Sequence, residues 1–297
     1  MKIAREPVCR ICDSPESVIV SEEVSGAPEA KVFQCAACDI VYLHPIMGAD
    51  EESDFYEQDF PPYMEARSAP GGTDAASNFI SNLPEAERRI KFIRPHLDEA
   101  MSILEIGSST GHFLFSLQGY VDSVTGVEPG RAFADYARCR GIRTFEKLGD
   151  IQNEQFDVIL LYYVLEHMRD PVDCLSEIRR YLKPDGKLLL EVPNVEDVLF
   201  STYDIPSFGP FYFQKAHYYN FSRKTLEAVM EKSGYKPQIL PEQRYDLSNH
   251  LHWMMARRPG GKGKYSEIFS GTLESAYAET LKNHWLCDTL FGVGSTS

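Results

Sequence analysis

The chain has 297 residues, 43% of them hydrophobic, and a formal net charge of −14. This length suits one enzyme domain with an appendage, because a single core stops growing at roughly 250 to 300 residues. The negative charge would repel phosphate backbones, so neither nucleic acid nor an anionic membrane surface is an expected partner. No apolar run follows the N-terminus or approaches the ~18 residues of a membrane span, which predicts a soluble, cytoplasmic protein.

Two Cys-x-x-Cys motifs stand near the N-terminus. They are formed by Cys9, Cys12, Cys35 and Cys38. Their spacing predicts a zinc site with four thiolates, against the alternatives of two disulfides or four unrelated thiols. Because such an ion has no open position, the zinc is expected to be structural and to fold a zinc-ribbon-like segment, residues 1–48. The other cysteines are expected to be buried apolar fillers: Cys139, Cys174 and Cys287.

Residues 49–82 are predicted to be an acidic and aromatic linker or lid. The glycine- and proline-containing stretch 68–74 has the composition of a linker. The aromatic part before it has two interpretations. In the first, it folds over a cofactor and places Tyr56 or Tyr63 against a cationic group. In the second, its aromatic side chains only anchor the linker on the core.

The remaining chain, residues 83–297, alternates predicted helices and strands. A helix is expected at 83–97, with its arginines on a solvated face, and a second helix at 132–140. Short apolar runs predict strands at 103–106, 124–127, 142–145, 156–161 and 187–192. This alternation is typical of an α/β fold with a parallel sheet.

The turn after the first of these strands is the best candidate for a cofactor site. The strand ends in Gly107, and Gly111 opens a helical pattern, so backbone can approach a ligand closely there. An acidic residue for ribose hydroxyls follows about 20 positions later, at Glu128. Glu105, just before the first glycine, would repel a pyrophosphate but suits the cationic end of S-adenosylmethionine.

Four motifs in order carry a resemblance to a known family. They are the Glu105 to Gly111 turn, Val127-Glu128-Pro129, the segment 156–167 and the segment 182–194. Together they resemble the class I S-adenosylmethionine-dependent methyltransferases over roughly residues 85–295. One departure is Ser109, where the family has a middle glycine. The resemblance implies a Rossmann-like seven-stranded sheet with helices on both faces, with the last two strands at 237–240 and 289–293 and an insertion at about 241–286.

The resemblance also assigns the cofactor residues. The turn residues Glu105, Gly107, Ser108 and Gly111 and the ribose-binding Glu128 are joined by Asp150 for the adenine and Tyr162 for the methionyl moiety. S-adenosylmethionine is therefore the expected cofactor, beside structural zinc.

The acceptor is expected to meet the segment after the fifth strand, residues 193–222, whose aromatic and proline density predicts a shaped loop. Three residues there and before it are candidates to take a proton from the acceptor: His217, Tyr218 and His167. His217 is the first choice, against a structural role in the loop. Glu166 and His167 are expected to open a helix, where the glutamate could act only as a capping residue.

A four-cysteine segment ahead of a methyltransferase core resembles two groups. One acts on sugar nucleotides and other precursors of polysaccharides or natural products, and the other methylates ribosomal RNA. The charge favours a small-molecule acceptor. A third possibility is an interaction protein that binds the cofactor without turnover. The sequence leaves open the acceptor atom, whether it is oxygen, nitrogen or carbon, and the oligomeric state.

Overall fold

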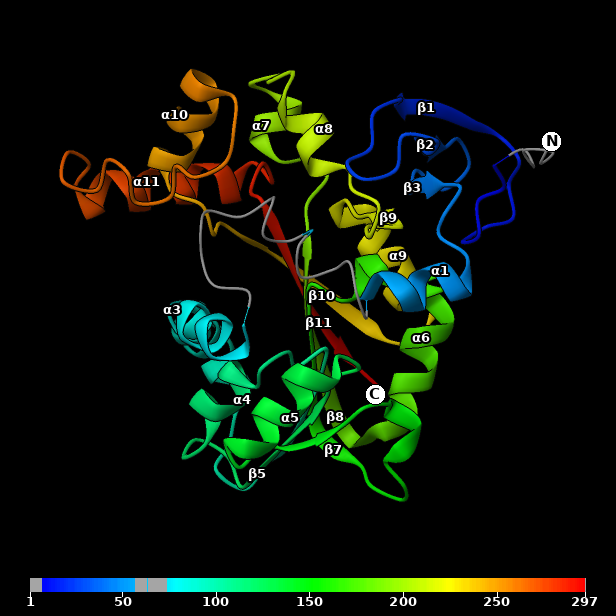
Figure 1. Ribbon diagram of the computed structural model, residues 1–297, viewed down its shortest axis with the longest axis vertical. Helices are drawn as coiled ribbons and strands as arrows, with labels where there is room; N and C mark the ends of the chain where they lie inside the picture. The colour runs from blue at the N-terminus through cyan, green and yellow to red at the C-terminus, as the bar shows by residue number, and fades with distance from the viewer. Residues whose placement is uncertain (1–6, 57–62, 64–73, 297) are drawn as a thin grey trace. The chain divides into compact units, whose positions relative to one another are not determined.

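The computed structural model describes residues 7–56, 63 and 74–296 (Figure 1). The chain forms two compact units. The first contains residues 1–48, 165–175 and 191–292, and the second contains residues 49–164, 176–190 and 293–297. Tyr56 and Tyr63 of the predicted lid both pack near Phe55, with ring centroids 5.3 and 5.5 Å from its ring. Within the predicted linker or lid 49–82, residues 57–62 and 64–73, and with them most of the stretch 68–74, lie outside the described residues.

A seven-stranded sheet has the strand order β10-β11-β8-β7-β4-β5-β6. Its strands are β4 (Ser102–Ile106), β5 (Ser123–Val127), β6 (Arg143–Phe145), β7 (Phe156–Tyr162), β8 (Leu182–Pro193), β10 (Lys236–Glu242) and β11 (Thr289–Ser295). The pairs β4–β5, β4–β7 and β5–β6 are parallel. The predicted α/β class with a seven-stranded methyltransferase sheet is thereby confirmed, and β4 is a central strand with fully buried aliphatic side chains.

Among the described residues of the second unit two helices precede β4, and two more alternate with the strands β4, β5 and β6, as predicted. They are α1 (Ala49–Asp54), α3 (Ala75–Ile93), α4 (His112–Leu117) and α5 (Arg131–Cys139), with short 3₁₀ turns η2 (Arg94–His96), η3 (Leu148–Asp150) and η5 (Arg179–Tyr181). Helix α3 begins eight positions before the predicted start at Leu83. Asp74 caps it by accepting from the amides of Ala76 and Ser77 at 3.0 and 3.1 Å, so the predicted linker ends in a helix cap.

The first unit holds a smaller antiparallel sheet of four strands, in the order β1-β2-β3-β9. Three strands come from the cysteine-containing segment: β1 (Ser17–Ser21), β2 (Lys31–Cys35) and β3 (Val41–His44). The fourth, β9 (Tyr219–Asn220), comes from much later in the chain and pairs Val41 with Asn220. The N-terminal segment therefore shares its sheet with residues that follow His217.

Four helices of the first unit contribute to an aromatic cluster: α7 (Val198–Ser201), α8 (Phe208–Tyr212), α10 (Leu247–Ala256) and α11 (Gly271–Asn283). Helix α9 (Arg223–Lys232) also belongs to this unit, and α6 (Pro171–Ile178) begins in it. Phe208, Trp253 and Leu281 are among the buried residues of the cluster, so the predicted loop 193–222 packs with the helices of the predicted insertion 241–286. No helix within the described ranges is long and apolar enough to cross a membrane.

Candidate cofactor and active site

The turn after β4 has the backbone geometry that the glycine pattern predicts. Gly107 and Gly111 have φ values of +75° and +74°. The amides of Gly107 and Ser108 donate to the carbonyl of Val127 at 2.8 and 3.0 Å, which fixes the turn against β5. A Cβ on Gly107 would lie 2.5 Å from a methyl group of Val164, so no side chain fits there.

Ser109 stands where the family pattern has its middle glycine. Its φ is +50°, so it adopts the left-handed conformation that glycine would adopt without strain. Its hydroxyl lies 3.4 Å from the side-chain oxygen of Asn78, and its amide donates to Glu128 at 2.8 Å. The turn keeps its shape at this departure because these contacts offset the backbone strain.

Glu128 ties this turn to the next one. One carboxylate oxygen accepts from the amide of Ser109 at 2.8 Å, and the other accepts from the amide of Gly130 at 2.7 Å. Burial raises the pKa of Glu128, while the two amide bonds oppose that rise. Each oxygen has a second lone pair, so the carboxylate can still accept from two ribose hydroxyls.

Glu105 is a buried carboxyl with one oxygen that accepts no hydrogen bond from the described residues. It is 2% exposed, and its Oε2 has no hydrogen-bond partner among the described residues, nor does the buried Ser108 hydroxyl. Burial raises the pKa of Glu105 to about 8, although the positive charge of Arg89 opposes the rise. Buried polar atoms without partners are costly, so this pair of groups fits a polar, cationic ligand such as the amino end of S-adenosylmethionine.

Arg89 is a site residue that the sequence interpretation missed. The predicted solvated face is wrong for this residue, because Arg89 is 7% exposed and its guanidinium lies 4.2 Å from the ring centroid of Tyr162. The buried Ala86 and Ile93 stand three positions before and four after it, and this spacing was the available signal. Arg89 acts electrostatically on Glu105, so a positive charge and a titratable carboxyl lie near each other, a combination that suits a zwitterionic amino-acid tail.

His112 is a second buried residue near this turn that the sequence did not single out. Burial, together with the positive charge of Arg89, lowers its pKa to about 4, although Glu85 opposes this. The imidazole is therefore neutral near pH 7 and adds no charge beside the turn.

Two further predicted cofactor residues occupy different surroundings. Tyr162 ends β7 and is buried, with its ring centroid 5.1 Å from that of Phe113. Asp150 is exposed at the end of η3, beside the buried Ile151. Their contacts with the cofactor stay predictions.

The first unit brings together two of the three predicted proton acceptors. The rings of His167 and His217 lie edge to face, with centroids 4.8 Å apart. Glu166 joins them, and one ligand atom from each of the three residues lies within 4.8 Å of the others. Glu166 and His167 lie in the 3₁₀ turn η4 (Leu165–His167), while α6 begins only at Pro171, so the expectation that they open a helix is wrong. We refer to Glu166, His167 and His217 as the Glu-His-His cluster.

Burial sets the charge of this cluster. It raises the pKa of Glu166 to about 8, despite the opposing positive charge of Arg244, and lowers the pKa of His167 to about 4. Near pH 7 burial therefore favours the neutral forms of Glu166 and His167. Tyr218, the third predicted residue, contributes through its backbone: its amide donates to the carbonyl of Glu166 at 2.8 Å, and its carbonyl accepts from the amide of Leu43 at 2.9 Å.

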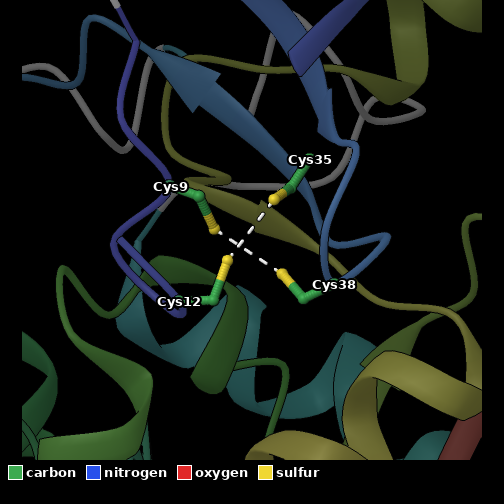
Figure 2. Close-up of side chains that lie close together, drawn as sticks. All are labelled: Cys9, Cys12, Cys35 and Cys38. Atoms are coloured by element: carbon green, nitrogen blue, oxygen red, sulfur yellow. Dashed lines mark hydrogen bonds between the residues drawn. The ribbon is translucent and has the colours of Figure 1, made fainter. Parts of the chain in front are cut away.

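The four N-terminal cysteines converge on one point (Figure 2). The sulfur atoms of Cys9 and Cys38 are 3.7 Å apart, and those of Cys12 and Cys35 are 3.5 Å apart. A tetrahedral zinc ion with ~2.3 Å bonds places its sulfurs roughly 3.8 Å apart, whereas a disulfide needs about 2.05 Å. The arrangement fits a metal ion held by four thiolates. Among the other cysteines Cys287 is buried as predicted, but that prediction is wrong for the exposed Cys139 and the half-buried Cys174.

Comparisons with known proteins agree with this geometry. The profile of a family described as a methyltransferase domain matches residues 79–238. A tRNA U34 carboxymethyltransferase from Hydrogenovibrio crunogenus is 31% identical over 123 residues, which cover 35% of this chain and 36% of that protein. A polyketide synthase-nonribosomal peptide synthetase from Aspergillus clavatus is 32% identical over 118 residues, covering 34% of this chain and 3% of that protein. The match with the first of these relatives thus covers only about a third of that protein's length.

A solved structure shows the same fold at low identity. The magnesium protoporphyrin IX methyltransferase from Synechocystis PCC 6803 aligns with a TM-score of 0.52 and 10% identity, covering 82% of this chain and 97% of that chain.

Proposed function

The chain belongs to the methyltransferase domain family and is an S-adenosylmethionine-dependent methyltransferase, and from this premise we propose that its acceptor is a small molecule, such as a sugar nucleotide or a precursor of a natural product or polysaccharide. The observation that carries the proposal is the net charge of −14, which opposes binding of a polyanion far more than binding of a small solute.

The insertion offers a second, weaker support. A polar pocket of the first unit is lined by Gln243, Arg244, Tyr245, Asp246, Glu274 and Tyr277. Both charge signs and two aromatic side chains meet there, a combination that suits a hydroxylated or charged small molecule. Substrate choice commonly resides in such surface insertions on a rigid scaffold.

We assign the cofactor to the turn after β4. Glu105 takes the amino group of the methionyl tail, the backbone of Gly107, Ser108 and Gly111 forms the floor, and Glu128 accepts from the ribose hydroxyls. Asp150 faces the adenine and Tyr162 the methionyl moiety. When bound, S-adenosylmethionine supplies an already activated methyl group, so the chain's own residues need to hold the acceptor in line and remove its proton.

The Glu-His-His cluster is our candidate for that second task. Only residues 163–165 separate the end of β7 from Glu166, and ligands of open α/β sheets lie outside the carboxyl ends of the strands. Within the cluster His217 is the first choice for the proton acceptor, because it lies in the segment after β8 that is proposed to meet the acceptor. His167 and Tyr218 are the alternatives.

The cysteine cluster is proposed to hold a structural zinc ion without a direct part in the chemistry. Four protein thiolates would leave it no position for substrate. Metal analysis of protein purified without chelator should find about one zinc per chain, and its absence would remove the proposal.

RNA is the second candidate acceptor, because several of the curated relatives are tRNA U34 carboxymethyltransferases. A labelled-methyl transfer screen separates the two: one arm offers sugar nucleotides and hydroxylated small molecules, the other offers tRNA and ribosomal RNA. Label in the first arm alone supports the small-molecule proposal. Label in RNA alone, with its yield falling as salt rises, would replace it.

A further inference from the structure

The Glu-His-His cluster has features of a metal site that neither cysteines nor cofactor explain. Two imidazoles and one carboxylate come from two segments of the chain, η4 and the residues before β9, yet one ligand atom from each lies within 4.8 Å of the others. With metal–nitrogen and metal–oxygen bonds of about 2.0 to 2.2 Å, ligand atoms around one ion stand no more than about 4.4 Å apart, so only a small side-chain movement is needed to bring the three onto one ion.

Glu166 points independently to a ligand. It has no exposed surface, and neither carboxylate oxygen has a hydrogen-bond partner among the residues that the structure describes. A buried carboxylate is stable only when it is paired, hydrogen-bonded or bound to a metal. The other charged groups that influence it are Arg244, which is attractive, and Glu191, which is repulsive, and neither bonds to those two oxygens.

The surroundings of the cluster hold its ligands in place. The amide of Tyr218 donates to the Glu166 carbonyl at 2.8 Å, which joins the two segments. The side-chain amide of Gln214 lies 2.8 Å from Nε2 of His217, and the His167 ring bonds to the carbonyl of Ala216. The bond from the His167 ring to a backbone carbonyl is of the kind that orients the histidines of metal sites.

We propose that Glu166, His167 and His217 bind one divalent transition-metal cation. Two nitrogen donors disfavour Mg²⁺ and Ca²⁺, which prefer oxygen ligands, and favour ions such as Mn²⁺, Co²⁺ or Zn²⁺. Three protein ligands leave at least one coordination position open, in contrast to the four-thiolate site.

The open position gives the cation a part in the reaction, and this step alone rests on the proposed function. An acceptor hydroxyl bound there becomes more acidic and loses its proton to solvent. Its oxygen forms the new bond to the methyl carbon, the carbon–sulfur bond breaks, and the sulfur keeps the electron pair as a neutral thioether. His217 then acts as a ligand rather than as the base.

The test uses the full chain with one equivalent of zinc already in the cysteine site. Mn²⁺ and Co²⁺ are titrated by calorimetry, and bound Mn²⁺ is counted by electron paramagnetic resonance. We expect one further site per chain, weakened at least tenfold in Glu166→Gln and in His217→Asn. His284→Gln, which changes an exposed histidine, should bind like the wild type. Unchanged S-adenosylmethionine affinity in each variant shows that it is folded.

Absence of a second site for both ions, or wild-type affinity in both cluster variants, overturns the proposal. The acceptor screen tests the proposed function independently of the metal site. Metal binding without transfer of a methyl group to any acceptor would support the metal site but contradict the proposed function. Methyl transfer by a chain that binds neither ion overturns the site and returns the role of base to His217.

Discussion

Binding of S-adenosylmethionine should release a proton from Glu105. Because burial raises the pKa of this carboxyl to about 8, only about one tenth of the apo protein carries the carboxylate at pH 7. The cationic amino group of the cofactor binds the ionised form, so the apparent affinity scales with that fraction. The affinity should therefore rise about tenfold from pH 6 to pH 7.

The proton itself can be counted. Titration calorimetry at pH 7 in two buffers with different ionisation enthalpies should report release of about 0.9 proton per cofactor bound. Glu105→Gln keeps the shape of the side chain but cannot ionise, so it should bind more weakly, release no proton at this site and lose the steep pH dependence. Wild-type protein whose affinity is flat between pH 6 and 7, with no proton released, would refute the assignment of Glu105.

The same shift predicts an effect on stability without cofactor. The folded-state pKa of Glu105 lies above the ordinary value of 4.5, so the folded protein holds a proton that the unfolded chain releases. Stability should fall as pH rises from about 4.5 to 8, by up to ~1.4 kcal/mol per pH unit from this group. Because other buried carboxyls contribute as well, the informative quantity is the difference in slope between the wild type and Glu105→Gln in urea unfolding.

Three further predictions concern the turn and the cysteine segment. Ser109→Gly should be about 1 kcal/mol more stable to urea than Ser109→Ala, because only glycine relieves the positive φ; equal stabilities would contradict this. Glu128→Ala should weaken S-adenosylmethionine binding by roughly 2 kcal/mol or more in calorimetry, and unchanged affinity would remove Glu128 from the site. Cys38→Ser should lower methyl transfer while leaving cofactor affinity unchanged, whereas Cys139→Ser, at an exposed cysteine, should alter neither.

The sequence predicted most of the sheet because local patterns define it. Strand β5 begins one residue before its predicted range, and β7 ends one residue after it. The start of α3 was harder, since Pro84 lies inside the helix and the true cap, Asp74, stands in a stretch with the composition of a linker. Arg89 escaped notice because a charged residue in a helix is normally placed on the solvated face, whereas its burial here goes with an ion pair to Glu85, 3.9 Å away, and a contact with the Tyr162 ring.

Contacts between distant segments could not be predicted from local patterns. Nothing near Val41 indicates that it pairs with Asn220, about 180 positions later. For the same reason the sequence suggested His167 and His217 separately, and Glu166 only as a capping residue, while their convergence became visible in the fold.

The pairing of β3 with β9 gives the cysteine segment a role beyond its own folding. β2 and β3 lie next to the cysteine motif, β3 hydrogen-bonds to Tyr218, and Tyr218 in turn donates to Glu166. The segment also contacts α9 through an ion pair, in which Nζ of Lys224 lies 2.5 Å from a carboxylate oxygen of Asp39. If the four cysteines hold the proposed zinc ion, a small sheet without a large core would depend on it for stability. Loss of the ion would then loosen β3, then β9, and with it the distance between His217 and Glu166, so we expect the pairing of β3 with β9 to couple the ion to the acceptor chemistry.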